Sequence, residues 1–219
     1  MELRLVSREE YKVLRVRSRM YNRKKTKVCR RFGERLFSEV KVSDDKLAVP
    51  PGKQPGRRRR GGISEYGRQL QEKQKLKHVY GLREKQFRNT YEQALKSDDP
   101  APVAFLKRLE RRLDNIVYRG SMAKTRDHAR QIVSHGHILV NGKKVTIPSY
   151  LVSQGDVISF ADKQTTNIQQ AKEAMKEAES SGWLTIDQKK HTVSMTHDPG
   201  VEELIQMFDV SLVVQFYSR

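Results

Sequence analysis

Residues 108 to 160 read RLERRLDNIVYRGSMAKTRDHARQIVSHGHILVNGKKVTIPSYLVSQGDVISF, and this stretch decides the fold. In and just before its first part, apolar residues recur at 3.6-residue spacing, which is typical of a helix that packs one face on a core. The apolar positions are Phe105, Leu109, Leu113, Ile116 and Val117, whereas the cations Lys107, Arg108, Arg111 and Arg112 lie off that face. The pattern predicts a helix with one packed face and one positive face.

A second helix is predicted between Thr125, a suitable N-cap, and Gly136, a suitable stop. Its spacing buries one set of residues and leaves another set free in solvent. The buried set is Ala129, Ile132 and Val133, and the free set is Arg126, Arg130 and Gln131. This helix is therefore expected to add a second positive face.

A tight hairpin is predicted next, because Asn141-Gly142 is a strong signal for a type I′ turn. The expected pairing sets residues 138–140 opposite residues 145–147, with Lys143 and Lys144 at the turn. The cations of the two helices and of the turn would then converge beside an RNA backbone.

The composition of the whole chain also indicates a polyanion binder. Its 219 residues include 44 Lys and Arg against 26 Asp and Glu, and the sequence pI is about 10.1. Charge alone does not separate RNA, DNA and anionic membrane. The excess is greatest in residues 1–60, which carry +13, while residues 161–219 carry −3. The C-terminal quarter is therefore expected to pack on protein and not on phosphate.

Several classes of protein are disfavoured by the same composition. No apolar run approaches the roughly 20 residues needed to cross a bilayer, and no signal-peptide core follows the N-terminus. A lone Cys29 excludes an intramolecular disulfide framework, so an intracellular protein is expected. The basic first 25 residues also fit an organellar transit peptide, although Glu2, Glu9 and Glu10 argue against one.

Breaks in the pattern divide the rest of the chain. Proline and glycine make residues 47–63 a loop; Ser64 then opens a helix that Gly81 stops. A second helix follows, with Phe87, Tyr91 and Leu95 at i, i+4 spacing. The remaining expected features are a linker at 99–102, a helix ending near Gly182, short strands, and an apolar segment before the C-terminus. A hydrophobic content of 36% suits two small domains plus an extension.

Several segments resemble one known family in order and spacing. They are SEYGRQLQEKQKLKHVYGLREKQFRNTYEQA at 64–94, RLDNIVYR at 112–119, ARQIVSHGHILVNGKKV at 129–145 and FYSR at 216–219. These segments resemble the alpha-L RNA-binding motif as carried by bacterial-type small-subunit ribosomal protein four. The resemblance runs from about residue 29 to the C-terminus and is weak at 34–63 and 161–215.

The resemblance implies an α+β fold. A helical domain would carry an inserted alpha-L RNA-binding domain, in which helices pack on a small antiparallel sheet, and a basic N-terminal extension would precede both. The implied boundaries are 1–44 for the extension, 45–101 with 183–219 for the helical domain, and 102–182 for the alpha-L domain.

The candidate site consists of RNA-contact residues, and most of them also have a purely structural interpretation. Arg126 and Arg130 occupy the family motif's RNA-facing positions, although they would also keep a helix soluble, and arginine suits phosphate because its planar fork binds two oxygens. Lys143 and Lys144 are expected to act as point charges. The full predicted set is Arg30, Arg31, Arg57, Arg58, Arg59, Arg60, Arg108, Arg112, Arg126, Arg130, Gln131, His135, His137, Asn141, Lys143 and Lys144.

The run Arg57 to Arg60 is read in two ways. A charge run is usually a solvated loop, yet glycines on both sides would give phosphate access to the backbone. In the family, a Pro-Pro-Gly segment before this loop contacts ribosomal RNA. Here that segment, residues 50–56, is one residue longer than the common pattern and lacks its histidine.

No metal and no cofactor are expected. His135 and His137 flank Gly136, but they have no nearby cysteine or carboxylate cluster, so RNA contact or turn packing is favoured. Some family members carry four cysteines as a zinc site near the N-terminus. This chain keeps only Cys29, with Thr26 where a Cys-x-x-Cys partner would stand.

An enzyme is not expected. Arg112-Leu113-Asp114 resembles a motif of certain pseudouridine synthases, in which the aspartate is the nucleophile. In those enzymes the RNA-binding module precedes a separate catalytic domain, whereas Asp114 lies inside the module itself. Asp114 is therefore expected to pair with a neighbouring arginine or to cap structure, and no nucleotide loop or nucleophile elbow occurs elsewhere.

The family resemblance implies a structural constituent of the small ribosomal subunit. Expected partners are the 5′-domain junction of small-subunit ribosomal RNA, neighbouring small-subunit proteins with protein five first among them, and messenger RNA near its entrance tunnel. The resemblance also implies early binding in assembly, support of decoding fidelity, and a cytoplasmic or organellar ribosome as location. The alternative is a stand-alone RNA-binding regulatory or stress factor, but the long helical segment at 64–97 argues against it.

Overall fold

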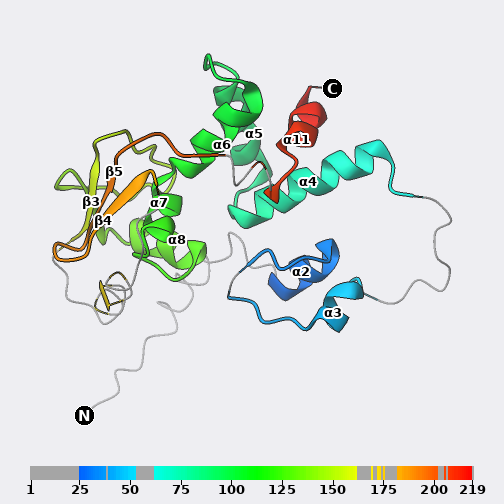
Figure 1. Cartoon of the computed structure of the whole chain (residues 1–219), viewed down its shortest axis with the longest axis horizontal. Coiled ribbons are helices and arrows are strands. Elements are labelled where there is room, and N and C mark those ends of the chain that lie inside the picture. The colour runs from blue at the N-terminus through cyan, green and yellow to red at the C-terminus, as the bar shows by residue number, and fades with distance from the viewer. Residues whose placement is uncertain are drawn as a thin grey trace, which may run out of the picture.

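The described residues form two main units with separate cores and a smaller N-terminal cluster. The computed structural model describes residues 25–37, 39–52, 62–161, 169, 172, 173, 175, 182–201, 205 and 207–218. A unit of packed helices lies beside a unit in which helices cover a five-stranded sheet, so the α+β class is confirmed (Figure 1). In this described part of the chain, no helix is long and apolar enough to cross a membrane.

The helical unit is built on four helices. They are α4 (Glu65–Val79), α5 (Glu84–Ala94), α6 (Ala101–Glu110) and α11 (Val210–Tyr217). Ser64 caps α4 as predicted, because its hydroxyl accepts from the Gly67 N–H at 3.2 Å. Gly81 follows α4 at a φ of +61°, which a glycine adopts at little cost. At the centre of the core, the ring of Phe105 meets those of Phe87 and Tyr91 edge-on.

Among the elements that the structure describes, the sheet unit combines two helices with five short strands. Its elements are α7 (Leu113–Arg119), α8 (Arg126–Ser134), β1 (Ile138–Val140), β2 (Lys143–Lys144), β3 (Val157–Phe160), β4 (Leu184–Asp187) and β5 (Thr192–Met195). The strands pair antiparallel in the order β2-β1-β3-β5-β4. One apolar core joins both helices to the sheet, and Met175 also contributes to it.

The helix predicted to run through residues 105–117 is two helices in the structure. All five predicted packing residues are fully buried, but Phe105 and Leu109 lie in the helical core whereas Leu113, Ile116 and Val117 lie in the sheet core. The chain breaks at Arg112, whose backbone is extended and forms an isolated bridge to Leu151. One apolar pattern therefore serves two cores.

The hairpin forms as predicted, but its expected register is wrong. Asn141 and Gly142 have φ values of +50° and +75°, as a type I′ turn requires. A two-residue turn leaves no room for further loop residues, so Val140 pairs directly with Lys143. Lys143 and Lys144 consequently form β2 instead of lying in the turn, and both side chains are exposed.

The packing also differs from the expected domain boundaries. Strands β4 and β5 join the sheet, although residues 183–219 were expected to complete the helical domain. Conversely, α6 packs in the helical core, although the alpha-L domain was expected to start at residue 102. Val201, Phe208 and α11 return the chain to the helical core, and α11 packs along α4.

The N-terminal segment is more ordered than a basic extension. Two helices, α2 (Lys25–Phe32) and α3 (Asp44–Ala48), pack around a small cluster of Cys29, Val42 and Leu47. Helix α2 lies against α4, where the rings of Phe32 and His78 are 6.1 Å apart. Residues 1–24, which include eight Lys and Arg against three Glu, lie outside the described residues.

The C-terminal helix is held to the helical unit by a carboxylate at the start of α5. Glu84 accepts from Lys73 and Lys77 at 2.7 Å and from the Tyr217 hydroxyl at 2.9 Å. The Lys73 ammonium also lies 4.3 Å from the ring centre of Phe216. Partial burial opposes ionisation of Glu84, but these three donors outweigh it and lower its pKa to about 2.

We expect Glu84→Gln to destabilise the protein at pH 7 and to lose that effect in acid. A carboxyl whose pKa falls from 4.5 to about 2 on folding contributes stability above pH 4.5, and the contribution disappears as the pH falls toward 2. Because the side chain is 46% exposed, the difference at pH 7 should be no more than about 1 kcal/mol. Urea unfolding of both proteins between pH 7 and pH 3 measures it. A difference that stays constant over this range would contradict the assignment.

Candidate nucleic-acid interface

Helix α8 places its side chains on three different surfaces. Thr125 caps the helix as predicted, because its hydroxyl accepts from the His128 N–H at 3.1 Å. The predicted core residues of this helix are buried, and Gln131 is exposed as predicted. Arg126 and Arg130, one turn apart, face the junction with the helical unit instead of solvent. The expectation that these two arginines are free is therefore wrong.

The hairpin lies against the C-terminal end of α8. Gly136 ends the helix as predicted, with a φ of +72°, and Lys144 packs directly over it. A Cβ at Gly136 would lie 2.1 Å from Lys144 Cε and 2.7 Å from its Nζ, so the end of the lysine side chain would have to shift, and the positive φ itself favours glycine. This packing brings a cation to the negative end of the helix dipole, which is favourable.

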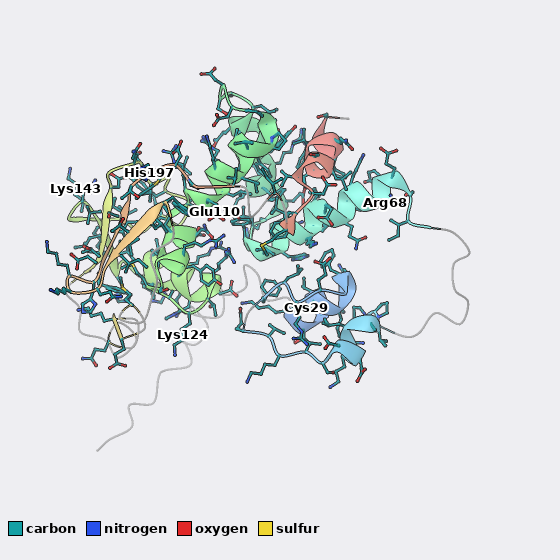
Figure 2. All side chains as sticks on the ribbon, in the orientation of Figure 1. Cys29, Arg68, Glu110, Lys124, Lys143 and His197 are labelled. Atoms are coloured by element: carbon teal, nitrogen blue, oxygen red, sulfur yellow. The ribbon has the colours of Figure 1, made fainter. Side chains whose placement is uncertain are left out.

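One group of predicted RNA-contact residues is exposed at this end of the sheet unit. The group, which we call the hairpin surface, consists of Gln131, His135, Asn141, Lys143 and Lys144. Figure 2 shows Lys143 at the outer edge of the molecule and Glu110 near its centre, where the two units meet. The Asn141 amide also has a structural task, since it donates to Asp156 at 2.7 Å and accepts from the Val157 N–H at 2.9 Å.

A second group of predicted residues is engaged inside the protein. The carboxylate of Asp114, which is 2% exposed, accepts two hydrogen bonds from the guanidinium of Arg112, at 2.9 and 3.1 Å. The same carboxylate accepts from Arg130 at 2.8 and 3.0 Å. We call these three residues the Asp114 clamp. They confirm the prediction that Asp114 pairs with a neighbouring arginine.

A second buried carboxylate lies close by on α6. Glu110, 1% exposed, accepts from the Tyr80 hydroxyl, from Asn115 at 2.9 Å and from Arg119 at 3.2 Å. Burial, followed by the charge of Glu110, raises the pKa of Tyr80 well above its usual value. Arg126 completes this Glu110 network by donating to Asn115 at 3.0 Å.

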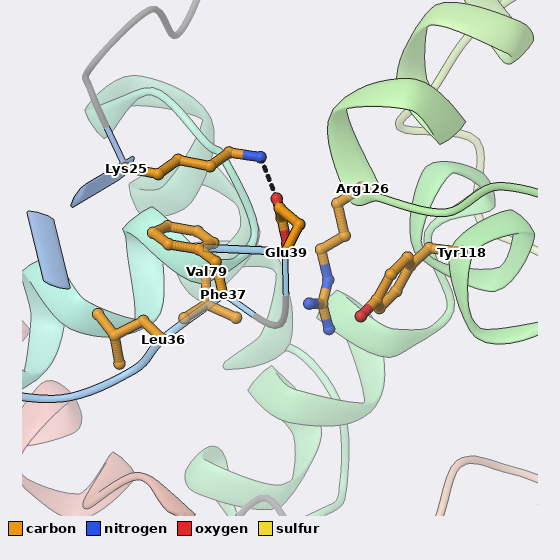
Figure 3. A pocket seen from close by; sticks show the side chains of 7 residues that line it. All are labelled: Lys25, Leu36, Phe37, Glu39, Val79, Tyr118 and Arg126. Atoms are coloured by element: carbon orange, nitrogen blue, oxygen red, sulfur yellow. Dashed lines mark hydrogen bonds and ion pairs between the residues drawn. The ribbon is translucent and has the colours of Figure 1, made fainter. Parts of the chain in front are cut away.

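Arg126 is held by two aromatic rings as well. Its guanidinium carbon lies 4.4 Å from the ring centre of Tyr118 and 5.2 Å from that of Tyr80. Figure 3 shows the guanidinium beside Tyr118 in a small cavity whose other wall carries the ion pair of Lys25 and Glu39. Lys25 also pairs with Asp127 at 2.7 Å and so ties α2 to the start of α8.

The remaining predicted arginines fall into three cases. Arg108 donates to Gln93 at 2.7 and 3.2 Å, and partial burial, together with the charge of Arg111, lowers its pKa. Arg30 donates to the backbone carbonyl of Lys46 in α3 and to that of Val49, the residue after this helix. Arg31 is exposed. Arg57, Arg58, Arg59 and Arg60 lie outside the described residues.

The two histidines beside Gly136 do not form part of a metal cluster. The rings of His135 and His137 are 6.2 Å apart. Among the residues that the structure describes, no three histidine, cysteine or acidic side chains are grouped as a metal would require.

Sequence reasoning missed the Glu110 network. Its signal is an acidic residue at i+4 from a core leucine: Glu110 follows Leu106 by one turn, on the face that packs. A charged residue on an apolar stripe is buried only if it is paired. Such a position therefore predicts a buried ion pair, but it does not identify the partners.

Comparisons with known proteins agree over most of the chain. Residues 20–110 match the model of the ribosomal protein S4/S9 N-terminal domain, and residues 111–158 match that of the S4 domain. The small ribosomal subunit protein uS4 of Brevibacillus brevis is 46% identical over 200 residues, covering 91% of this chain and 98% of its own. The uS4 proteins of Geobacillus kaustophilus and Halothermothrix orenii are 46% and 42% identical, each covering 88% of this chain and 96% of their own.

Proposed function

The chain belongs to the family of small ribosomal subunit protein uS4, and from this membership we propose that it is a structural constituent of the small ribosomal subunit that binds ribosomal RNA. The observation that carries the proposal is the match of these relatives over about nine tenths of the chain. The proposed mechanism is electrostatic and geometric and has no chemical step, as family membership implies, and the buried carboxylates Glu110 and Asp114 are assigned a structural part as partners of cations.

The proposed contact region is the hairpin surface. Lys143 and Lys144 are exposed on β2, and they would act as point charges toward phosphate. Gln131 and His135 lie at the adjoining end of α8, where they would hydrogen-bond sugar or base groups. Arg31 on α2 would give the helical side of the molecule a contact of its own. Arg57 to Arg60, which lie outside the described residues, are proposed to contact phosphate as well.

Finer roles are proposed on the family resemblance. The RNA would be a multi-helix junction in the 5′ domain, bound early in assembly so that its fold is fixed. Neighbouring protein five and messenger RNA at the entrance tunnel would be further partners, and the protein would support decoding fidelity in a cytoplasmic ribosome. The negative C-terminal quarter suits contact with protein better than contact with phosphate.

Nuclease footprinting on small-subunit RNA tests the proposal. The chain should protect one compact junction, and protection scattered over the RNA would contradict it. Co-sedimentation at high salt separates the alternative of a stand-alone regulatory factor, because a subunit constituent stays with the particle when salt weakens phosphate contacts. Loss of the chain from small subunits under those conditions would favour the alternative.

We expect Lys143→Ala to weaken binding to that junction and to flatten its salt dependence. Losing one phosphate contact should reduce the slope of log affinity against log salt by about 0.7 to 0.9. The affinity itself should fall roughly tenfold, as for the loss of a charge-assisted contact. Thermal stability should change little, because exposed substitutions usually stay within about 0.5 kcal/mol.

The matched control is Lys96→Ala. Lys96 is also exposed, but it lies after α5 beside Asp98 and Asp99, where local negative charge discourages phosphate. Filter binding or fluorescence anisotropy at four salt concentrations compares the two variants. Equal losses would mean that total charge binds the RNA, without a shaped site.

A further inference from the structure

Arg130 has almost no hydrogen-bonding capacity left for RNA. A guanidinium has five N–H groups, and four of those on Arg130 are directed at protein oxygens. Two reach Asp114, one reaches the Gly81 carbonyl at 2.6 Å, and one reaches the Tyr80 carbonyl at 2.9 Å. A bidentate phosphate contact would require breaking bonds of this set.

The oxygens that Arg130 contacts belong to both units. Asp114 lies on α7 in the sheet unit, whereas Tyr80 and Gly81 form the end of α4 in the helical unit. Gly81 permits the approach, since a Cβ at this position would lie 3.1 Å from Arg130 Nη1 and its φ is positive. Arg130 thus spans the junction, and Asp114 fixes its direction.

Arg112 holds the carboxylate from the other side. It is 6% exposed, its fork is bidentate to Asp114, and its own backbone forms the break between α6 and α7. The Asp114 clamp therefore sits where the chain passes from the helical core to the sheet core. A buried carboxylate accepting from two arginines has a narrow range of allowed geometries.

We propose that the Asp114 clamp sets the orientation of the sheet unit on the helical unit before RNA binds, so that the cations of both units form one preset surface. Arg112 and Arg130 are then positioning residues that act through Asp114, not phosphate contacts. This inference rests on the proposed RNA-binding function. Presetting the surface helps because the RNA does not have to supply the free energy of ordering the two units.

Asp114→Asn distinguishes this mechanism from direct contact between the arginines and phosphate, because the two mechanisms predict opposite changes in RNA affinity. The substitution raises the formal net charge of +18 by one unit and frees two arginines, so a phosphate-contact mechanism predicts tighter RNA binding. The clamp predicts weaker binding, on the order of tenfold, which is typical of coupling between two parts of a protein. The salt slope should stay at the wild-type value, because the phosphate contacts themselves remain.

Two further variants complete the test. Asp98→Asn makes the same charge change at an exposed carboxylate between α5 and α6, and its affinity should equal or slightly exceed that of the wild type. Arg130→Lys keeps the charge but lacks the fork, so it should reproduce the loss seen with Asp114→Asn. The double variant Asp114→Asn, Arg130→Lys should bind RNA about as weakly as either single variant, since both changes break the same clamp.

The probe is the small-subunit RNA fragment that the wild-type chain protects from nuclease. Circular dichroism at the assay temperature checks folding, and if Asp114→Asn does not fold, Arg130→Lys decides. Weaker binding with an unchanged salt slope supports the clamp. Tighter binding by Asp114→Asn, or wild-type affinity in Arg130→Lys, overturns it while the RNA-binding function stands. If the wild-type chain protects no fragment, the proposed function fails, and the inference fails with it.

Discussion

Replacing Glu110 by alanine is expected to lower the free energy of unfolding by about 3–5 kcal/mol, the cost of removing one partner from a buried ion pair. The carboxylate is 1% exposed and accepts from Tyr80, Asn115 and Arg119. Without it, the Tyr80 hydroxyl and the Asn115 amide stay buried without their acceptor, and Arg119 loses its counter-charge. The loss is large because Glu110 is buried at the centre of the junction, where the groups that it leaves behind are shielded from solvent.

Chemical denaturation at pH 7 measures this loss, with Glu92→Ala as the control. Glu92 also pairs with an arginine, Arg88 at 2.9 Å, but both side chains are more than half exposed, so its removal should cost less than about 1 kcal/mol. Glu110→Gln offers a second readout. Removing the negative charge should lower the pKa of Tyr80 relative to wild type. Equal losses for Glu110→Ala and Glu92→Ala would show that the network is not a stabilising one.

Phe105→Ala is the second substitution for which we expect a loss of about 3–5 kcal/mol, because it leaves a cavity in a packed core. The Phe105 ring is fully buried, and it meets the rings of Phe87 and Tyr91 edge-on at 5.0 and 5.7 Å. Such aromatic pairs contribute beyond the area that they bury. Helices α5 and α6 should therefore lose much of their mutual packing.

The control for this core substitution is Leu95→Ala. Leu95 has the same i, i+4 relation to Tyr91 as Tyr91 has to Phe87, but it is 53% exposed and should cost less than about 1 kcal/mol. Phe105→Leu should recover part of the loss because it refills part of the cavity. Thermal unfolding of the three variants provides the measurement. A loss at Phe105 no larger than at Leu95 would contradict the central place of this ring in the core.

Local signals in the sequence predicted local structure well. Ser64 and Thr125 cap their helices, Gly136 ends α8, and Asn141-Gly142 makes the turn of the hairpin. Each of these is decided by a few neighbouring residues through capping or backbone freedom. The register of the hairpin was missed by two residues because the turn length, and not the apolar pattern, sets it.

The candidate site was predicted in part. Lys143 and Lys144 are exposed, as a polyanion-binding surface requires, and their contact with RNA stays a prediction. Arg112 and Arg130 were placed on the same surface, because helical periodicity separates polar from apolar faces but does not distinguish solvent from a polar junction. Their partner Asp114 was recognised as an ion-pairing residue from its place inside the motif.

By itself the sequence determined the α+β class, the positive character of the chain and the caps, turns and apolar positions of its helices, since each of these depends on composition or on residues close together in the chain. Only the tertiary structure decided that one apolar pattern serves two cores and that β4 and β5 complete the sheet. It also decided that Glu110 and Asp114 form ion pairs with the arginines of the junction. These outcomes depend on groups far apart in sequence, such as Tyr80 and Arg130, whose pairing arises only when two units pack and exclude water from the charges between them.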